Sequence, residues 1–158
     1  MKKVFISLFI LLLASFAFGQ SVKKMNIADL ENYISKSEKP LIINFWATFC
    51  KPCIEEIPYF QNTIKEKYEG LVDLVLVSLD LPDYFPKKIS SFITQRNFSV
   101  PIVWLNETNA DYFCPKIDVK WSGAIPATLM INNKTNYRKF YDRQLTPLQF
   151  EREVKELF

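Results

Sequence analysis

Two cysteines separated by two residues, Cys50 and Cys53, constrain this chain more than any other feature. Before them, residues 41–45 form a short apolar run, interrupted by one asparagine, that is typical of a buried strand. After them, four apolar residues recur at the spacing of one helix face: Ile54, Ile57, Phe60 and Ile64. A Cys-x-x-Cys pair at the junction of a buried strand and a helix is typical of a redox-active dithiol. The sequence therefore predicts reversible disulfide chemistry at this junction.

The start of a helix gives the two cysteines unequal chemistry. Its unpaired N–H groups and partial positive charge favour the thiolate form of a cysteine placed there. We therefore expect Cys50 to be the more exposed, attacking nucleophile, with the cation of Lys51 beside it. Pro52 would shape the first turn, where proline is tolerated. Cys53 lies one turn further in and would resolve a mixed disulfide held on Cys50.

A zinc site and a structural disulfide are weaker interpretations of the cysteine pair. A tetrahedral zinc site needs four thiolate or imidazole ligands, whereas the chain has three cysteines and no histidine. A purely structural disulfide would close a very small loop at an exposed helix start. The third cysteine, Cys114, stands apart from the pair, and a buried free thiol is the commoner fate of such a residue. We therefore predict that the chain binds no metal ion.

Hydrophobic patterns and turn signals predict alternating helices and strands over the rest of the chain. Helices are expected at residues 27–35, 51–70, 87–97 and 108–117 and from Pro147 onward, and strands at 41–46, 71–79, 100–105, 127–131 and 137–142. Residues 20–25 are expected to be a short tether. Pro58 falls within the second helical pattern and should kink that helix. This order of elements predicts an α/β three-layer sandwich with a central mixed sheet.

Two sequence motifs resemble those of a known superfamily. Residues 45–53 read Phe-Trp-Ala-Thr-Phe-Cys-Lys-Pro-Cys and resemble the active-site run of the thioredoxin superfamily. Residues 53–58 read Cys-Ile-Glu-Glu-Ile-Pro and are similar to the Cys-x-x-Glu-x-Pro extension of its extracytoplasmic TlpA/ResA branch. The resemblance runs from about residue 25 to the C-terminus. It implies a thioredoxin-like α/β/α sandwich in which residues 86–105 add a helix and a strand, and a redox-active disulfide in place of any other cofactor.

A further motif of the superfamily is matched by Ile125 and Pro126, which stand before an apolar strand. The resemblance implies that the bond between them is cis and faces the dithiol. A cis bond there would turn the backbone N–H and C=O of Ile125 outward, where a substrate strand could pair with them. We expect Thr128 and Trp121 to flank this groove. Trp46 and Phe49 are expected to wall the dithiol and exclude water.

Cys53 needs a base to accept its proton. Cytosolic thioredoxins carry a buried aspartate at the position of Asn44, and an amide cannot take up that proton. The family spacing points to Glu56, three residues after Cys53 on the same helix. Asp80, at the carboxyl end of a predicted central strand, is a second candidate for the proton shuttle. A carboxyl buried near a thiol would have a raised pKa and could exchange protons near neutrality.

The first nineteen residues have the pattern of a secretory signal peptide. Two lysines precede an almost unbroken apolar run at residues 4–13, and small residues at 17 and 19 suggest cleavage after Gly19. The domain would then comprise residues 20–158. A retained membrane tether is the alternative. Export would place the dithiol in an oxidising periplasmic or extracytoplasmic compartment, and the net charge of +3 gives no reason to expect nucleic acid as a partner.

The resemblance implies an exported reductase of disulfides in other proteins, for instance in c-type cytochrome maturation, recharged by an integral-membrane electron donor. A disulfide-forming oxidase would carry the same motifs. A thiol peroxidase on this fold would have threonine or serine three residues before the reactive cysteine, where this chain has Ala47. A copper-binding chaperone would have a Cys-x-x-x-Cys pair and a histidine, and the chain has neither.

Overall fold

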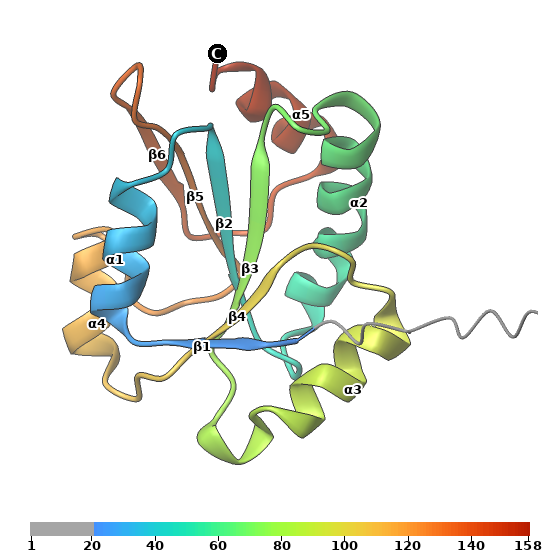
Figure 1. Ribbon diagram of the computed structural model, residues 1–158, viewed down its shortest axis with the longest axis vertical. Helices are drawn as coiled ribbons and strands as arrows, with labels where there is room; N and C mark the ends of the chain where they lie inside the picture. The colour runs from blue at the N-terminus through green and yellow to red at the C-terminus, as the bar shows by residue number, and fades with distance from the viewer. Residues whose placement is uncertain (1–20) are drawn as a thin grey trace, which may run out of the picture.

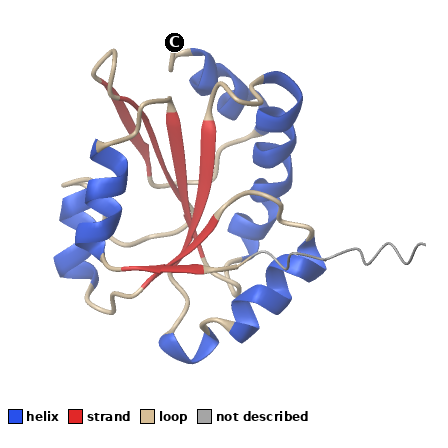
Figure 2. Ribbon diagram, viewed as in Figure 1, coloured by secondary structure: helices blue, strands red, loops and turns tan. Residues whose placement is uncertain are grey.

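The computed structural model describes residues 21–158, so the expected signal peptide lies outside the described residues (Figure 1). Within that range the chain forms one six-stranded sheet with helices on both faces (Figure 2). The strands are β1 (Lys23–Met25), β2 (Leu41–Trp46), β3 (Asp73–Ser78), β4 (Ile102–Leu105), β5 (Ala127–Asn132) and β6 (Tyr137–Tyr141). Their order across the sheet is β1-β4-β3-β2-β5-β6. The first four strands in this order are parallel neighbours, β5 pairs antiparallel with β2, and β6 pairs antiparallel with β5, which confirms the predicted mixed sheet.

Two helices cover one face of the sheet and three cover the other. The helices are α1 (Ile27–Ser35), α2 (Lys51–Lys67), α3 (Lys87–Arg96), α4 (Ala110–Ile117) and α5 (Pro147–Lys155), with a short 3-10 helix, η1 (Pro82–Tyr84), before α3. In Figure 1, α1 and α4 lie to the left of the sheet and α2, α3 and α5 to the right. Among the described residues, none of the helices combines the length and the apolar content needed to cross a membrane.

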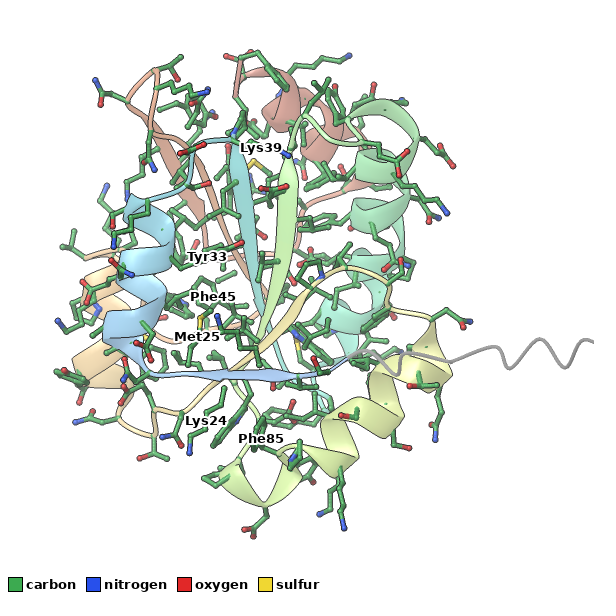
Figure 3. The ribbon with its side chains drawn as sticks, viewed as in Figure 1. Lys24, Met25, Tyr33, Lys39, Phe45 and Phe85 are labelled. Carbon is green, nitrogen blue, oxygen red and sulfur yellow. A yellow bond between two sulfur atoms is a disulfide. The ribbon has the colours of Figure 1, made fainter. Side chains whose placement is uncertain are left out.

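The central strand β2 separates two hydrophobic clusters. Its six residues are all buried, because helices cover both faces of the sheet. Ile42 and Trp46 pack into the cluster under α2, α3 and α5, which also contains both cysteines of the pair. Phe45 packs with Met25 into the cluster under α1 and α4, and both of these side chains are labelled in Figure 3. The loop that leads from β2 to Cys50 therefore begins in a fully buried part of the protein.

The expectation of a tether at residues 20–25 is wrong. Lys23 and Met25 begin and end the edge strand β1, which pairs in parallel with β4. The C=O of Met25 accepts a hydrogen bond from the N–H of Asn106 at 2.8 Å, and the Met25 side chain is buried. The strand was missed because two of its three residues are exposed lysines. Lysine is nevertheless common on edge strands, where its charge prevents pairing with other chains.

Two predicted boundaries shift in the structure. Helix α2 ends at Lys67, whereas the sequence suggested Gly70; that glycine has a φ of 74° and lies in the turn that leads into β3. Leu71 is exposed, and β3 starts only at Asp73. Pro58 lies inside α2, which is continuous from Lys51 to Lys67.

Residues 86–105 form the added helix–strand unit that the resemblance implied. The unit supplies α3 and β4, and β4 lies between β1 and β3 in the sheet. The connection from β3 contains a second cis bond, Phe85–Pro86, which the sequence analysis missed. Phe85, labelled in Figure 3, stacks on Trp104 of β4 with ring centroids 4.5 Å apart. This stacking holds the loop that carries η1 against the sheet.

We expect the ion pair between Glu153 of α5 and Lys139 of β6 to be the main contact between these elements that weakens at low pH. The Glu153 side chain is buried, and it lies 2.7 Å from Lys139 Nζ and 2.8 Å from Arg152 Nη2. Burial alone would raise the pKa of Glu153, but hydrogen bonds from Lys139 and Arg152 outweigh it and lower the pKa to about 2. The folded-state pKa lies below the unfolded one. The stabilisation is therefore complete above the unfolded pKa and is lost as the pH falls toward 2.

Accordingly, Glu153→Gln should lower the free energy of unfolding at pH 7 by about 2 kcal/mol, a value discounted because both cations are largely solvent-exposed. The difference from the unchanged protein should shrink as the pH is lowered from 5 to 3, in urea unfolding followed by circular dichroism. Glu151→Gln, on the same helix, is the control and should have a smaller effect. A Glu153→Gln difference that stays constant over this pH range would contradict the prediction.

Candidate active site

Cys50 and Cys53 are joined in a disulfide at the N-terminus of α2. Cys50 is the N-cap residue, and its Sγ accepts a hydrogen bond from the Cys53 N–H at 3.4 Å. The sulfurs are 1.99 Å apart. Cys50 is 7% exposed and Cys53 is fully buried, which agrees with the expected difference in access. An amide N–H directed at the Cys50 sulfur favours a thiolate there once the disulfide is reduced.

Asp80 holds the loop that leads to Cys50. Its Oδ1 accepts hydrogen bonds from Thr48 Oγ1 at 2.6 Å and from the Thr48 N–H at 3.1 Å. Its Oδ2 accepts from Ser78 Oγ at 2.8 Å, and its backbone C=O accepts from Trp104 Nε1 at 2.8 Å. These contacts join the end of β3, the loop and β4. They explain why Asp80 is buried, as a support of the loop. Its role as a proton shuttle stays a prediction.

Glu56 is a fully buried carboxyl one turn along α2 from Cys53. Its Oε1 accepts a hydrogen bond from Asn44 Nδ2 at 2.7 Å, and its Oε2 accepts from the Leu145 N–H at 3.1 Å. Burial raises the pKa of Glu56 to about 7, although the hydrogen bonds from Leu145 and Asn44 oppose the shift. A carboxyl that is half ionised near neutrality can take up or release a proton with little cost in free energy. Glu56 therefore has the burial and the raised pKa expected of a proton carrier, and that role stays a prediction.

The Ile125–Pro126 bond is cis, as the resemblance implied. It stands directly before β5, which pairs antiparallel with β2 so that Ala127 lies opposite Phe45. The next positions along the two strands are Pro126 and Trp46, four residues before Cys50. Pro126 is buried and Ile125 is half-buried. The sheet register therefore brings the cis bond to the same end of β2 as the disulfide.

Phe49 is largely exposed, and its expected role in excluding water from the dithiol stays a prediction. Its side chain is 69% exposed, because the loop held by Asp80 turns it outward. Trp46, in contrast, is fully buried and packs against Phe92 and Phe98, with ring centroids 5.9 and 5.5 Å away. Trp46 thus belongs to the core behind the disulfide, while Phe49 is open to solvent and its contact with a substrate stays a prediction.

Lys51 and Pro52 form the exposed rim of the helix start. The Lys51 ammonium lies 3.9 Å from Glu55, one turn along α2, and its side chain is 87% exposed. Such a pair in water contributes little energy. The Pro52 C=O accepts a hydrogen bond from Gln144 Nε2 at 3.2 Å, which ties the rim to the loop before α5. Both residues are open to solvent beside the disulfide, and their contact with a substrate stays a prediction.

Thr128 and Trp121 do not flank a groove. Thr128 is fully buried, and its Oγ1 accepts a hydrogen bond from Asn44 Nδ2 at 3.1 Å. Trp121 is buried against Phe45, with ring centroids 4.5 Å apart. Both are held on the inner side of their segments by contacts that only the assembled sheet creates. The expected groove walls at these two positions are therefore wrong.

The polar partners of Glu56 were missed by sequence reasoning. The one available signal was Asn44 itself, a polar residue inside an otherwise apolar strand. Its pairing with Thr128 and Glu56 depends on the register of β2 with β5 and on the packing of α2 over the sheet. Cys114 is buried and unpaired, as expected, and burial raises the pKa of its thiol to about 11. Among residues 21–158, no group of three or more potential ligand side chains gathers into a metal site.

Comparison with known proteins agrees with this geometry. A family model described as the AhpC/TSA family matches residues 16–139. Thiol-disulfide oxidoreductase ResA of Halalkalibacterium halodurans is 28% identical over 113 residues, which cover 72% of this chain and 59% of the relative. ResA of Oceanobacillus iheyensis is 35% identical over 78 residues, covering 49% of this chain and 36% of the relative. The chain thus spans about a third to three-fifths of the length of these relatives.

Solved structures show the same fold. A thioredoxin-related protein from Neisseria meningitidis serogroup B superimposes with a TM-score of 0.62 at 27% identity, covering 78% of this chain and 85% of that one. StoA of Bacillus subtilis gives a TM-score of 0.56 at 23% identity, covering 77% and 86% of the two chains. The observed α/β sandwich with its mixed sheet is therefore the thioredoxin-like fold that the sequence motifs implied.

Proposed function

This chain belongs to the AhpC/TSA family, and from that premise we propose that it is a thiol–disulfide oxidoreductase acting through Cys50 and Cys53. The observation that carries the proposal is the Cys50–Cys53 disulfide at the start of α2, with the buried carboxyl of Glu56 one turn away. A dithiol in this position can give two electrons to another disulfide, or accept two from another dithiol. The ResA relatives, which carry thiol-disulfide oxidoreductase in their names, support it.

In the reducing direction, the reaction starts from the dithiol form. The Cys50 thiolate attacks one sulfur of a target disulfide, forming a mixed disulfide and releasing the other target sulfur as a thiolate, which takes a proton. The Cys53 thiol then gives its proton to the Glu56 carboxylate and attacks the Cys50 sulfur. This step forms the Cys50–Cys53 disulfide and releases the second target sulfur, to which the proton passes. The target gains two electrons and two protons: the protein supplies both electrons and the Cys53 proton, and water supplies the proton that the first target thiolate takes up.

We assign the reducing direction, with disulfides of exported proteins as substrates and c-type cytochrome precursors among them. The signal-peptide pattern at residues 1–19 supports export. The similarity of residues 53–58 to the TlpA/ResA extension supports the choice of substrate. In an oxidising compartment the disulfide must be reduced again after each turnover, so the proposal includes an integral-membrane electron donor.

A disulfide-forming oxidase is the second candidate. It is favoured by the hydrogen bond from the Cys53 N–H to Cys50 Sγ, because stabilising the thiolate makes a disulfide more oxidising. A thiol peroxidase has less support. Thr48 is the hydroxyl residue nearest before Cys50 in the chain, and its hydroxyl donates a hydrogen bond to the Asp80 carboxylate.

The reduction potential of Cys50–Cys53 separates these candidates. It can be measured by equilibrating the protein with glutathione buffers, with Cys114→Ser in parallel to remove the third thiol. We expect a potential at or below about −220 mV, in the range of reducing dithiol proteins such as thioredoxin and glutaredoxins. A potential above about −150 mV would reverse the direction to oxidation. A dithiol that shows no two-electron equilibrium would overturn the proposal as a whole.

A further inference from the structure

A buried amide links the proton carrier to the strand that follows the cis proline. Asn44 of β2 is fully buried, and its Nδ2 donates to Glu56 Oε1 at 2.7 Å and to Thr128 Oγ1 at 3.1 Å. Within residues 21–158, its Oδ1 has no hydrogen-bond partner. Three elements, α2, β2 and β5, therefore meet at this one side chain. A buried polar atom without a partner costs stability, so its retention needs a physical reason.

The chemistry of a carboxyl supplies a reason for the unpartnered oxygen. An ionised Glu56 can only accept hydrogen bonds, so the amide must present Nδ2 to it, as the structure shows. A protonated Glu56 becomes a donor through its O–H, and the reversed amide would present Oδ1 to it. Thr128 suits both orientations, because a hydroxyl both accepts and donates. Each orientation leaves one amide atom without a partner, so reversal adds no further unpaired group.

We propose that Asn44 is a positioning residue that holds the Glu56 carboxyl in both of its protonation states, with its side-chain amide reversing when the carboxyl takes up or gives away a proton. The inference rests on the proposed function, in which Glu56 accepts the proton of Cys53 and later returns it. Without a reversible partner, the protonated Oε1 would face an amide donor and lose its hydrogen bond after the first transfer. Asn44 keeps it one turn from Cys53 throughout the cycle.

Only the oxygen of Glu56 that faces Asn44 changes from acceptor to donor. From the loop before α5 the Leu145 N–H donates to Oε2, which remains an acceptor when the proton is on Oε1. On α2 the titratable neighbours are Cys53, Tyr59 and the exposed Glu55. The Tyr59 hydroxyl donates to the Leu145 C=O, and burial together with the charge of Glu56 raises its pKa to about 12. Tyr59 therefore stays neutral while Glu56 titrates.

The first test replaces the amide by an apolar side chain of similar size. In Asn44→Leu the ionised form of Glu56 loses a donor, so the midpoint of the Glu56 carboxyl titration, followed by carbon NMR, should rise by about one pH unit. The rate at which Cys53 resolves a mixed disulfide should fall about tenfold at pH 7 and recover toward pH 9. An effect that is merely structural would lower the rate equally at every pH and leave the Glu56 midpoint unchanged, and that result would overturn the proposal.

A matched control is available on the same sheet. Asn132 of β5 is also buried, and its Nδ2 donates to the Leu157 C=O at 2.7 Å, at the opposite end of the strand from Pro126. Asn132→Leu removes a comparable amide and should lower stability without moving the Glu56 midpoint. A shift as large as that of Asn44→Leu would show that the midpoint reports general loosening of the sheet, which contradicts the proposal.

The second test needs no substitution and addresses the reversal itself. In the unchanged protein, the side-chain N–H resonances of Asn44 should shift with pH, with the same midpoint as the Glu56 carboxyl. Resonances that stay constant while Glu56 titrates would show that the amide does not reverse. Either result is independent of turnover, because the disulfide form of the protein can be titrated. A failure here therefore differs from a failure of the proposed function, which would appear as a protein unable to exchange disulfides.

Discussion

Cys50→Ser should lower disulfide exchange by at least about 10³-fold, as expected for loss of a covalent nucleophile. A serine hydroxyl at the start of α2 is neutral at pH 7 and cannot form a disulfide with a target. Cys53→Ser should behave differently, because Cys50 can still attack but nothing resolves the product. That variant should accumulate a covalent mixed disulfide with a target protein, which mass spectrometry of the intact adduct would detect.

Cys114→Ser provides the control for both cysteine variants. Cys114 is a buried thiol in α4, outside the disulfide, and burial raises its pKa to about 11. A thiol with so high a pKa is almost entirely protonated at neutral pH and is a poor nucleophile. The replacement should leave the exchange rate unchanged. If Cys114→Ser lost the activity while Cys50→Ser kept it, the assignment of the reactive pair would be wrong.

Glu56→Gln should slow the resolving step by about 10²-fold at pH 7, within the range expected for loss of a general base. Glutamine is nearly the same shape and cannot take up the Cys53 proton. Burial raises the pKa of Glu56 to about 7, so the rate of the unchanged protein should rise with pH through that value as the carboxylate forms. The variant should lose this rise. Rapid-mixing measurements of mixed-disulfide decay between pH 5 and 9 would show both effects.

Glu56→Gln, although expected to slow the resolving step, should stabilise the fold at high pH. The folded-state pKa of Glu56 lies above the unfolded value, so its contribution to stability is complete below pH 4.5 and is lost as the pH rises through about 7. Above that pH, keeping Glu56 ionised in the fold costs about 3 kcal/mol, an upper value for a shift of this size. The free energy of unfolding of Glu56→Gln, compared with that of the unchanged protein, should therefore be higher at pH 8 than at pH 4.5. If the Asn44 amide reverses, its Oδ1 can accept a hydrogen bond from the new side-chain amide.

Glu55→Gln is the matched control for Glu56. Glu55 is the preceding residue on α2, but it is exposed and pairs with Lys51 at 3.9 Å. Its replacement should change neither the pH dependence of resolution nor the pH dependence of stability. If the two variants behaved alike, a general change in charge around the helix would account for the result, and the buried carboxyl would not be the proton carrier.

Much of the local structure followed from short stretches of the chain. The apolar run at 41–45, the Cys-x-x-Cys pair and the helical spacing after it specified a buried strand, a disulfide and a helix, and these lie where expected. These features depend on the period of apolar side chains and on the chemistry of helix ends, which neighbouring residues determine. The cis Pro126 and the choice of Glu56 came from family motifs, which record positions that a fold needs in common.

Other features came only from the assembled structure. The sequence of Lys23–Met25 has no strand pattern, and the segment is a strand because β4 offers its open edge. Phe49 points outward because Asp80, far away in the chain, holds the loop through Thr48. In both cases the deciding hydrogen bonds join residues that are far apart in the sequence, so no local pattern carries them.

The chain by itself pointed to the groups proposed for the chemistry: two cysteines separated by two residues, and a carboxyl three positions after the second. Tertiary structure alone decided the state of that carboxyl. The packing of α2 on the sheet removes Glu56 from water, and the register of β2 with β5 brings Asn44 and Thr128 to it. The pKa of a carboxyl depends on the solvation and partners that surround it in space, and only the fold supplies these.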